Sequence, residues 1–184
     1  MSELEERFRE DEQNTVACVF CDYKDIAATT PLYLMSSLVS QILDRPTEMP
    51  ENVVKLYEKH QRNASRPSLD ELFDLLQQLG KARSMYIIVD ALDECSDNDN
   101  GRNILLQQLS RLRCGCNILM TSRSSVSISE HFDDYQSIEI TAKESDIEKY
   151  ISGHLSGRLE AHIKRKPELY DEIRSAVIQR AQKM

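Results

Sequence analysis

The strongest signal of a buried strand in this sequence is Met85-Tyr-Ile-Ile-Val-Asp90-Ala-Leu-Asp93-Glu94. A short run this apolar, bounded by polar residues, is typical of a strand buried on both faces of a sheet. The run ends at Asp90, and two further carboxylates follow it closely. Ligands of open α/β sheets bind at the carboxyl ends of the strands. The stretch therefore predicts a buried strand that carries acidic side chains to a ligand-binding edge.

Three other short apolar runs have the character of strands: Thr15–Cys21, Asn117–Thr121 and Gln136–Ile140. Segments with helical spacing separate them, one opening at the cap Thr30-Pro31 and another running from the capping box Ser68-Leu-Asp-Glu71 to Gly80. Apolar strands separated by helices indicate a parallel sheet covered by helices. We predict an α/β domain over residues 1–143 and the start of a helical segment over 144–184, opened by the capping box Ser145-Asp-Ile-Glu148.

The composition excludes several classes of protein. The chain has 184 residues, of which 31 are acidic and 23 basic, so its net charge is −8. This charge repels phosphate polymers and anionic membranes, and the densest basic run, Lys164-Arg165-Lys166, is too short for a nucleic-acid interface. The first residues lack the apolar stretch of a signal peptide. We therefore expect a cytoplasmic protein with no nucleic-acid or membrane partner.

Two metal sites can be weighed against the sequence. Cys18-Val-Phe-Cys21 and Cys114-Gly-Cys116 could form a four-cysteine zinc site, but positions three apart in a strand face opposite sides of the sheet. Ser96-Asp-Asn-Asp-Asn-Gly101 is similar to the start of a calcium loop, but Ser96 and Gln107 stand where Asp and Glu ligands are needed. We expect neither ion, and we expect all five cysteines to be free thiols.

The acids after the buried strand have a chemical and a structural interpretation. An aspartate in the place of Asp90 can hold Mg²⁺ through a water, as in phosphate-loop nucleotidases. Asp93, three residues later, could orient an attacking water. Alternatively, Asp93 and Glu94 only stabilise the N-terminus of a helix, where negative charge is favoured.

An arginine follows the next strand of the same type. Arg123 lies just beyond Asn117–Thr121, and adjacent parallel strands end on the same rim, so Arg123 could face Asp90 across one crevice. There its guanidinium could contact a terminal phosphate through two hydrogen bonds. The alternative is a surface arginine that pairs with the acidic loop.

Four blocks, taken in order, are similar to successive blocks of a fungal NACHT domain: Phe20-Cys-Asp-Tyr-Lys24, Leu38-Val-Ser-Gln-Ile-Leu43, Ile88-Val-Asp-Ala-Leu-Asp-Glu-Cys95 and Ile118-Leu-Met-Thr-Ser-Arg123. More narrowly, they resemble the nephrocystin-3-type N-terminal NTPase module of NOD-like (STAND) signal proteins. The small residue Ala91 after the first aspartate and the second acid at Asp93 are typical of that group. The resemblance implies a phosphate-loop-NTPase-like sheet that binds ATP and Mg²⁺, with Asp90 at the metal, Asp93 in catalysis and Arg123 at the nucleotide.

The chain departs from this family at the phosphate loop. Nucleotide-binding members need Gly-x-x-x-x-Gly-Lys-Ser/Thr, whose backbone amides and lysine hold the phosphates. Only Gly80 precedes a lysine here, and Ala82 follows Lys81 where Ser or Thr is required. In the family, the loop and its strand precede a helix that matches residues 4–12. The missing strand would lie between the strands matching Asn117–Thr121 and Gln136–Ile140. Without it, those two strands must pair directly or leave open edges, which invite association with another chain.

We therefore interpret the chain as a truncated NACHT-type signal-NTPase domain without efficient ATP hydrolysis. It would act through protein–protein contacts or self-association. One alternative is a switch that binds ATP and Mg²⁺ once a partner chain or an upstream segment completes the site. Another is an unrelated α/β adaptor scaffold whose aspartates only cap helices.

Overall fold

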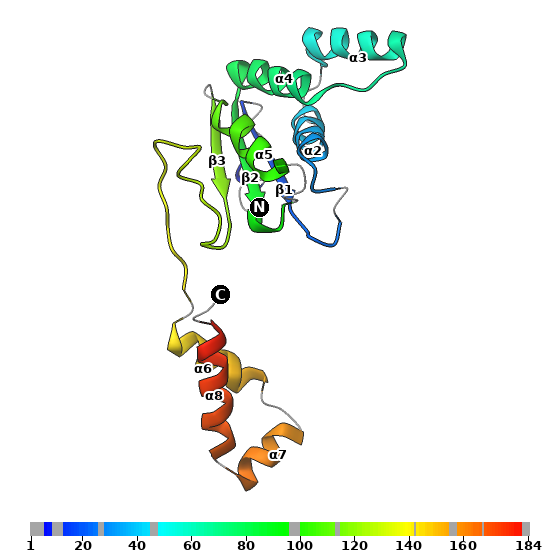
Figure 1. Ribbon diagram of the computed structural model, residues 1–184. Coiled ribbons are helices and arrows are strands. Elements are labelled where there is room, and N and C mark those ends of the chain that lie inside the picture. Colours follow the sequence, from blue (N-terminus) through cyan, green and yellow to red (C-terminus); the bar gives the residue numbers. More distant parts are fainter. Residues whose placement is uncertain are drawn as a thin grey trace. The chain divides into compact units, whose positions relative to one another are not determined.

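A computed structural model describes residues 6–8, 13–25, 28–44, 48–95, 100–112, 115–141, 143–154, 158–166 and 168–181 (Figure 1). The chain divides into two compact units, residues 1–134 and 135–184. The sequence predicted a boundary between residues 143 and 144. In the structure, residues 135–143 group with the second unit. The predicted helix over residues 4–12 lies mostly outside the described residues, of which Glu6 and Arg7 are helical.

The first unit contains a three-stranded parallel sheet in the order β1-β2-β3. Its strands are β1 (Asn14–Phe20), β2 (Ser84–Asp90) and β3 (Cys116–Met120). Ala17 of β1 lies beside Ile87 of β2, which lies beside Ile118 of β3. Helices flank the sheet (Figure 1), so the predicted α/β class and the parallel sheet are confirmed.

The prediction of a strand over Gln136–Ile140 is wrong. These residues form no strand, and the side chains of Ile138 and Ile140 are 85% and 91% exposed. They belong to the second unit, whose described elements are all helices. An alternating apolar pattern says which side chains share a face, but a strand also needs a neighbouring strand to bond with.

The first unit contains the helices α2 (Pro31–Leu43), α3 (Glu51–Asn63), α4 (Leu69–Ala82) and α5 (Gly101–Ser110), and the short 3-10 helix η1 (Leu92–Glu94). Thr30 caps α2 through the Tyr33 amide, and both bonds of the predicted capping box at Ser68 are present. Gly80 does not end α4, which continues to Ala82.

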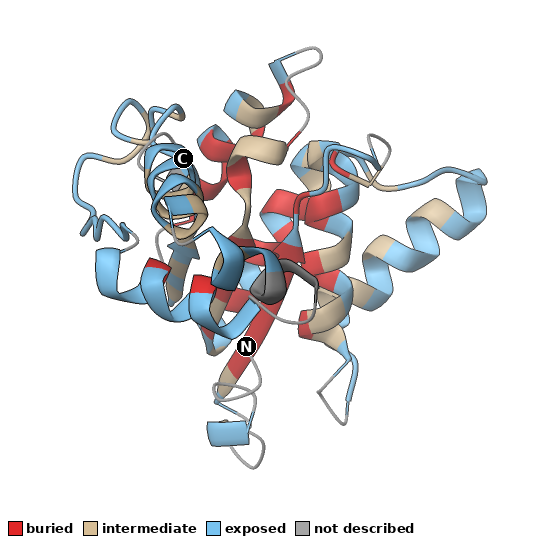
Figure 2. Cartoon of the chain, turned by 90° about the horizontal axis from the view of Figure 1, so that it is seen from below, coloured by how far each residue is buried: buried red, intermediate tan, exposed pale blue. Residues whose placement is uncertain are grey.

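One hydrophobic cluster joins the sheet to α2, α4 and α5. Met85, Ile87 and Val89 of β2 are fully buried within it. In Figure 2 the buried residues of this unit follow the strands and the facing sides of the helices. On the opposite face of β2, Phe8 stacks on Tyr86 with ring centroids 5.0 Å apart. Both faces of the predicted central run are therefore packed.

The second unit contains α6 (Glu144–His154), α7 (Arg158–Arg165) and α8 (Glu168–Ala181). Arg174 of α8 bonds to Glu148 and Glu144 of α6, with nitrogen–oxygen distances of 2.9 and 3.3 Å. Ser145 lies inside α6 and not at its cap, so the second predicted capping box is wrong. No helix within the described ranges is both long and apolar enough to cross a membrane.

Candidate functional site

The carboxyl ends of β2 and β3 meet at one edge of the sheet, called the rim below: Asp90, Ala91, Asp93, Thr121 and Arg123. Ala91 adopts a left-handed conformation (φ 54°) and turns the chain from β2 into η1. Its N–H donates to Thr121 Oγ1 at 2.9 Å, and the Leu92 N–H donates to the Thr121 carbonyl at 2.9 Å. Residues after β3 therefore fix the turn that carries the acids.

Asp90 is tied to the end of the neighbouring strand. The Thr121 hydroxyl donates a short hydrogen bond to Asp90 Oδ1. The Asp90 carbonyl accepts from the Cys21 N–H at 3.0 Å, which extends the β1–β2 pairing to the rim. Within the described part of the chain, no cation pairs with this carboxylate. Asp90 is thus oriented by a hydroxyl of the neighbouring strand end.

Asp93 and Arg123 bind each other. Arg123 Nε lies 3.2 Å from Asp93 Oδ2, and the Arg123 backbone N–H donates to Asp93 Oδ1 at 3.2 Å. The Asp93 side chain is only 14% exposed, whereas that of Arg123 is 61% exposed. The structure thus brings both predicted residues to the rim with Asp90. Arg123 pairs with the acidic loop, which was the alternative to a contact with a phosphate.

Arg102 completes this turn and was missed by the sequence reasoning. Its Nη2 lies 3.3 Å from the carbonyl oxygens of both Asp93 and Cys95. Arg102 is the second residue of α5, and a cation at a helix N-terminus opposes the helix dipole. That unfavourable position was the available signal that this arginine has another partner.

Two buried thiols lie beneath the rim. Cys95 Sγ donates to the Thr29 carbonyl at 3.4 Å. A hydrogen bond with Cys95 raises the pKa of Cys21, and burial and the nearby charges of Asp90 and Asp93 raise that pKa further. Cys21 therefore stays protonated at neutral pH, and a protonated thiol is a poor nucleophile and metal ligand.

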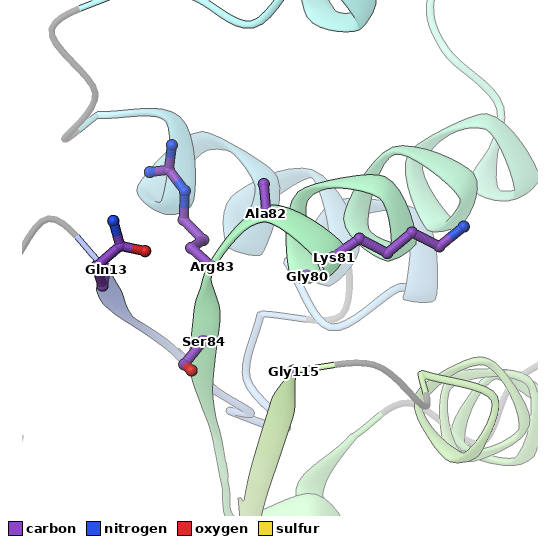
Figure 3. Close-up of a pocket in the computed structure, with 7 residues that line it drawn as sticks. All are labelled: Gln13, Gly80, Lys81, Ala82, Arg83, Ser84 and Gly115. Atoms are coloured by element: carbon purple, nitrogen blue, oxygen red, sulfur yellow. The ribbon is translucent and has the colours of Figure 1, made fainter.

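A shallow hollow of about 490 Å³ lies at the opposite end of the strands (Figure 3). Lys81 and Arg83 border it, but their side chains point in different directions. Its floor is a close backbone contact between Gly80 and Gly115. Gly115 has φ +67°, and a Cβ on it would lie 2.2 Å from the Gly80 carbonyl oxygen. The close approach therefore requires a glycine at position 115.

Residues 1–123 match the family model described as "Nephrocystin 3, N-terminal". The match covers two thirds of the chain and includes the whole rim. The chain belongs to the nephrocystin 3 N-terminal family. The four sequence blocks quoted above lie within the matched residues. No curated protein matches the sequence.

The described residues of this nephrocystin 3 N-terminal domain do not fit a nucleotide with its Mg²⁺. Gly80 and Lys81 lie in the last turn of α4, where the helix end carries partial negative charge. At the rim, the guanidinium that could contact a phosphate is bound to Asp93. Mg²⁺ commonly takes one or two protein carboxylates together with substrate phosphates, so Asp90 alone is compatible in type but holds nothing without a phosphate cradle. Nor do the described residues group three His, Cys, Asp or Glu side chains around a possible metal.

The sites considered for zinc and calcium lie partly outside the described residues. Cys18 and Cys21 are both buried, in and directly after β1, whereas Cys114 lies outside the described residues. The same holds for residues 96–99 of the loop weighed for calcium.

Proposed function

We propose that this domain is a NACHT-type, signal-NTPase-derived module that acts through protein–protein contacts and does not hydrolyse ATP efficiently by itself. The observation that carries the proposal is the pairing of Asp93 with Arg123. To act on a nucleotide, both side chains would have to be available, but they are bound to each other in an ion pair.

Releasing this pair is energetically unfavourable. If Arg123 turned towards a phosphate, Asp93 would lose its cation while its side chain stays largely buried. An unpaired carboxylate in such a place loses both a charge-assisted hydrogen bond and solvation. The turn is also held by Thr121 and Arg102, so Asp93 does not move freely with its partner.

Thermal unfolding of the full chain with Mg²⁺ and ATP tests the proposal. A ligand at 100 times its dissociation constant stabilises the folded state by about 2.7 kcal/mol, which is a clear shift in melting temperature. We expect no shift with ATP at high micromolar concentration, with or without Mg²⁺. A Mg²⁺-dependent shift that disappears in Asp90→Ala would contradict the proposal. Asp22→Ala, which changes an exposed carboxylate of the loop after β1, is the matched control.

A second candidate is a switch that binds ATP and Mg²⁺ after a partner chain or an upstream segment supplies the phosphate cradle. The observation that favours it is Asp90, which the Thr121 hydroxyl orients at the rim and which no cation neutralises among the described residues. This candidate predicts that the isolated chain shows no shift, whereas a longer form of the protein that includes a phosphate loop shows one. Asp90→Ala should then abolish the shift in the longer form.

A further inference from the structure

A basic segment joins α3 to α4 in a chain that is otherwise acidic. Residues 59–69 contain three Lys or Arg residues and one His but no Asp or Glu, whereas the whole chain has a net charge of −8. Most of this segment is exposed, and residues 65–67 are neither helix nor strand. A protein with an acidic binding groove is therefore favoured as the partner of this segment.

Two serines lie in the segment, and their hydroxyls have different partners. The Ser68 hydroxyl caps α4 by accepting from the Glu71 N–H at 3.3 Å. The Ser65 hydroxyl instead contacts a side chain, and its oxygen lies 2.7 Å from Nδ1 of His60. A group added to Ser65 would thus leave the helix cap in place, whereas a group added to Ser68 would remove it.

Glu71 determines which atom donates in the contact between His60 and Ser65. Lys59 and the Ser68 N–H lower the pKa of Glu71 to about 2, so its carboxylate is ionised at neutral pH and can only accept. His60 Nε2 lies 3.1 Å from Glu71 Oε2, so Nε2 carries the proton of the neutral ring. Nδ1 then accepts, and the Ser65 hydroxyl donates to it. The lone pairs of the exposed Ser65 oxygen are not used in this contact.

Arg62 lies three residues before Ser65, and no other arginine of the sequence has a serine or threonine at this distance after it. Protein kinases can recognise such an arginine with acidic side chains in the substrate groove. The Arg62 guanidinium contacts the side chain and the carbonyl of Glu58, at 3.7 and 3.2 Å. The two side chains are 75% and 56% exposed, and exposed pairs at this helical spacing stabilise little. A kinase can therefore take Arg62 from Glu58 at low cost.

We propose that Ser65 is the phosphorylation site of a protein kinase that recognises arginine three residues before the acceptor. In this reaction the γ-phosphoryl group of ATP is transferred to Ser65 Oγ. The bond to ADP breaks, the Oγ–P bond forms, and the hydroxyl proton passes to the catalytic aspartate of the kinase. The kinase provides the nucleotide site, so this inference goes beyond the proposed function and does not depend on it.

A phosphate on Ser65 would change the junction of α3 and α4. It adds about two negative charges beside Nδ1 of His60, in a stretch that Arg62 and Arg66 flank. A protonated His60 could then donate from both nitrogens, to the phosphate and to Glu71. Phosphorylation would therefore largely neutralise the basic segment and alter which proteins bind to it.

Phosphorylation of the purified full chain tests the inference. The chain is incubated with Mg²⁺, ATP and a purified kinase of this specificity, and the modified residue is located by mass spectrometry of its peptides. We expect a single phosphate on Ser65, and none in Ser65→Ala. Arg62→Ala should lower kcat/KM by at least about tenfold, because the kinase loses a charged contact. Arg66→Ala, the exposed arginine on the other side of the serine, is the matched control and should change kcat/KM by less than about threefold.

Ser68→Asn is a second control, because asparagine also caps helices but has no hydroxyl to phosphorylate. This variant should be modified on Ser65 as fast as the natural chain. Three results would overturn the inference: a folded chain that takes up no phosphate, a phosphate on another residue while Ser65 stays unmodified, or equal losses in Arg62→Ala and Arg66→Ala. Circular dichroism verifies that every variant remains folded. The melting experiment with ATP decides the proposed function separately.

Discussion

Side chains fix the geometry at one end of the β-sheet, and the backbone fixes it at the other. At the rim, side chains fix the geometry, because Thr121, Arg102 and Arg123 all bond to the turn after β2. At the hollow, the backbone fixes it, since Gly115 and Gly80 approach too closely for a Cβ. The cations at that end, Lys81 and Arg83, point in different directions (Figure 3). In this domain, charged side chains are held together at the rim and are not held together at the hollow.

The largest effect is expected at the hollow, from Gly115→Ala. The added Cβ would lie 2.2 Å from the Gly80 carbonyl oxygen, and the residue would also keep a positive φ. Strain of this kind costs on the order of 3 kcal/mol or more, because a backbone group must move. Urea unfolding followed by circular dichroism measures it. Gly153→Ala in α6 is the matched control, since its Cβ meets nothing within 4 Å, and it should be neutral or stabilising.

Arg102→Ala should have the next largest effect, at the rim. The change removes a charged donor from the carbonyls of Asp93 and Cys95. Bonds to charged groups contribute about 1.5–3 kcal/mol, so we expect a loss of about 2 kcal/mol in the same unfolding experiment. Lys81→Ala, which removes an exposed cation at the hollow, should change stability by less than about 0.5 kcal/mol. Equal losses in the two variants would contradict the contrast between the two ends.

Thr121→Val tests the rim with a smaller change. Valine keeps the shape of threonine but neither donates to Asp90 nor accepts from the Ala91 N–H. We expect a loss of about 1–2 kcal/mol, since partners in a half-exposed turn can turn to water. Ser122→Ala, on the next residue, removes only an exposed hydroxyl that bonds to the Arg123 carbonyl and should cost less. A larger loss in Ser122→Ala would mean that Thr121 does not hold the turn.

The smallest effect is expected far from both ends, at Glu71 in α4. The Lys59 ammonium, 2.6 Å away, and the Ser68 N–H lower the pKa of Glu71 from 4.5 to about 2. A carboxylate with a lowered pKa stabilises the fold fully above its ordinary pKa, and this contribution is lost as the pH falls from 4.5 towards 2. Unfolding between pH 6 and 2.5 should therefore depend less on pH in Glu71→Gln than in the natural chain. Asp70→Asn, an exposed neighbour in the same turn, is the control.

Local signals in the sequence predicted much of this fold. The caps at Thr30 and Ser68 and the apolar run before Asp90 depend on neighbouring residues, so α2, α4 and β2 could be recognised without the structure. The strand predicted over Gln136–Ile140 failed because a strand depends on a distant partner. Residues at the rim lay between these cases. Their position at one edge follows from the parallel strands. The ion pair between Arg123 and Asp93, however, depends on the conformation of a turn that the sequence does not specify.

Whether the domain binds nucleotide by itself can be measured by titrating the full chain with a fluorescent ATP analogue, with and without Mg²⁺. Because Arg123 is bound to Asp93 and the glycine–lysine pair lies in a helix end, we predict no saturable binding up to high micromolar protein. Binding in the low micromolar range that requires Mg²⁺ and disappears in Asp90→Ala would show that another part of the chain holds the phosphates. The pairing of Asp93 with Arg123 would then not prevent the domain from binding ATP.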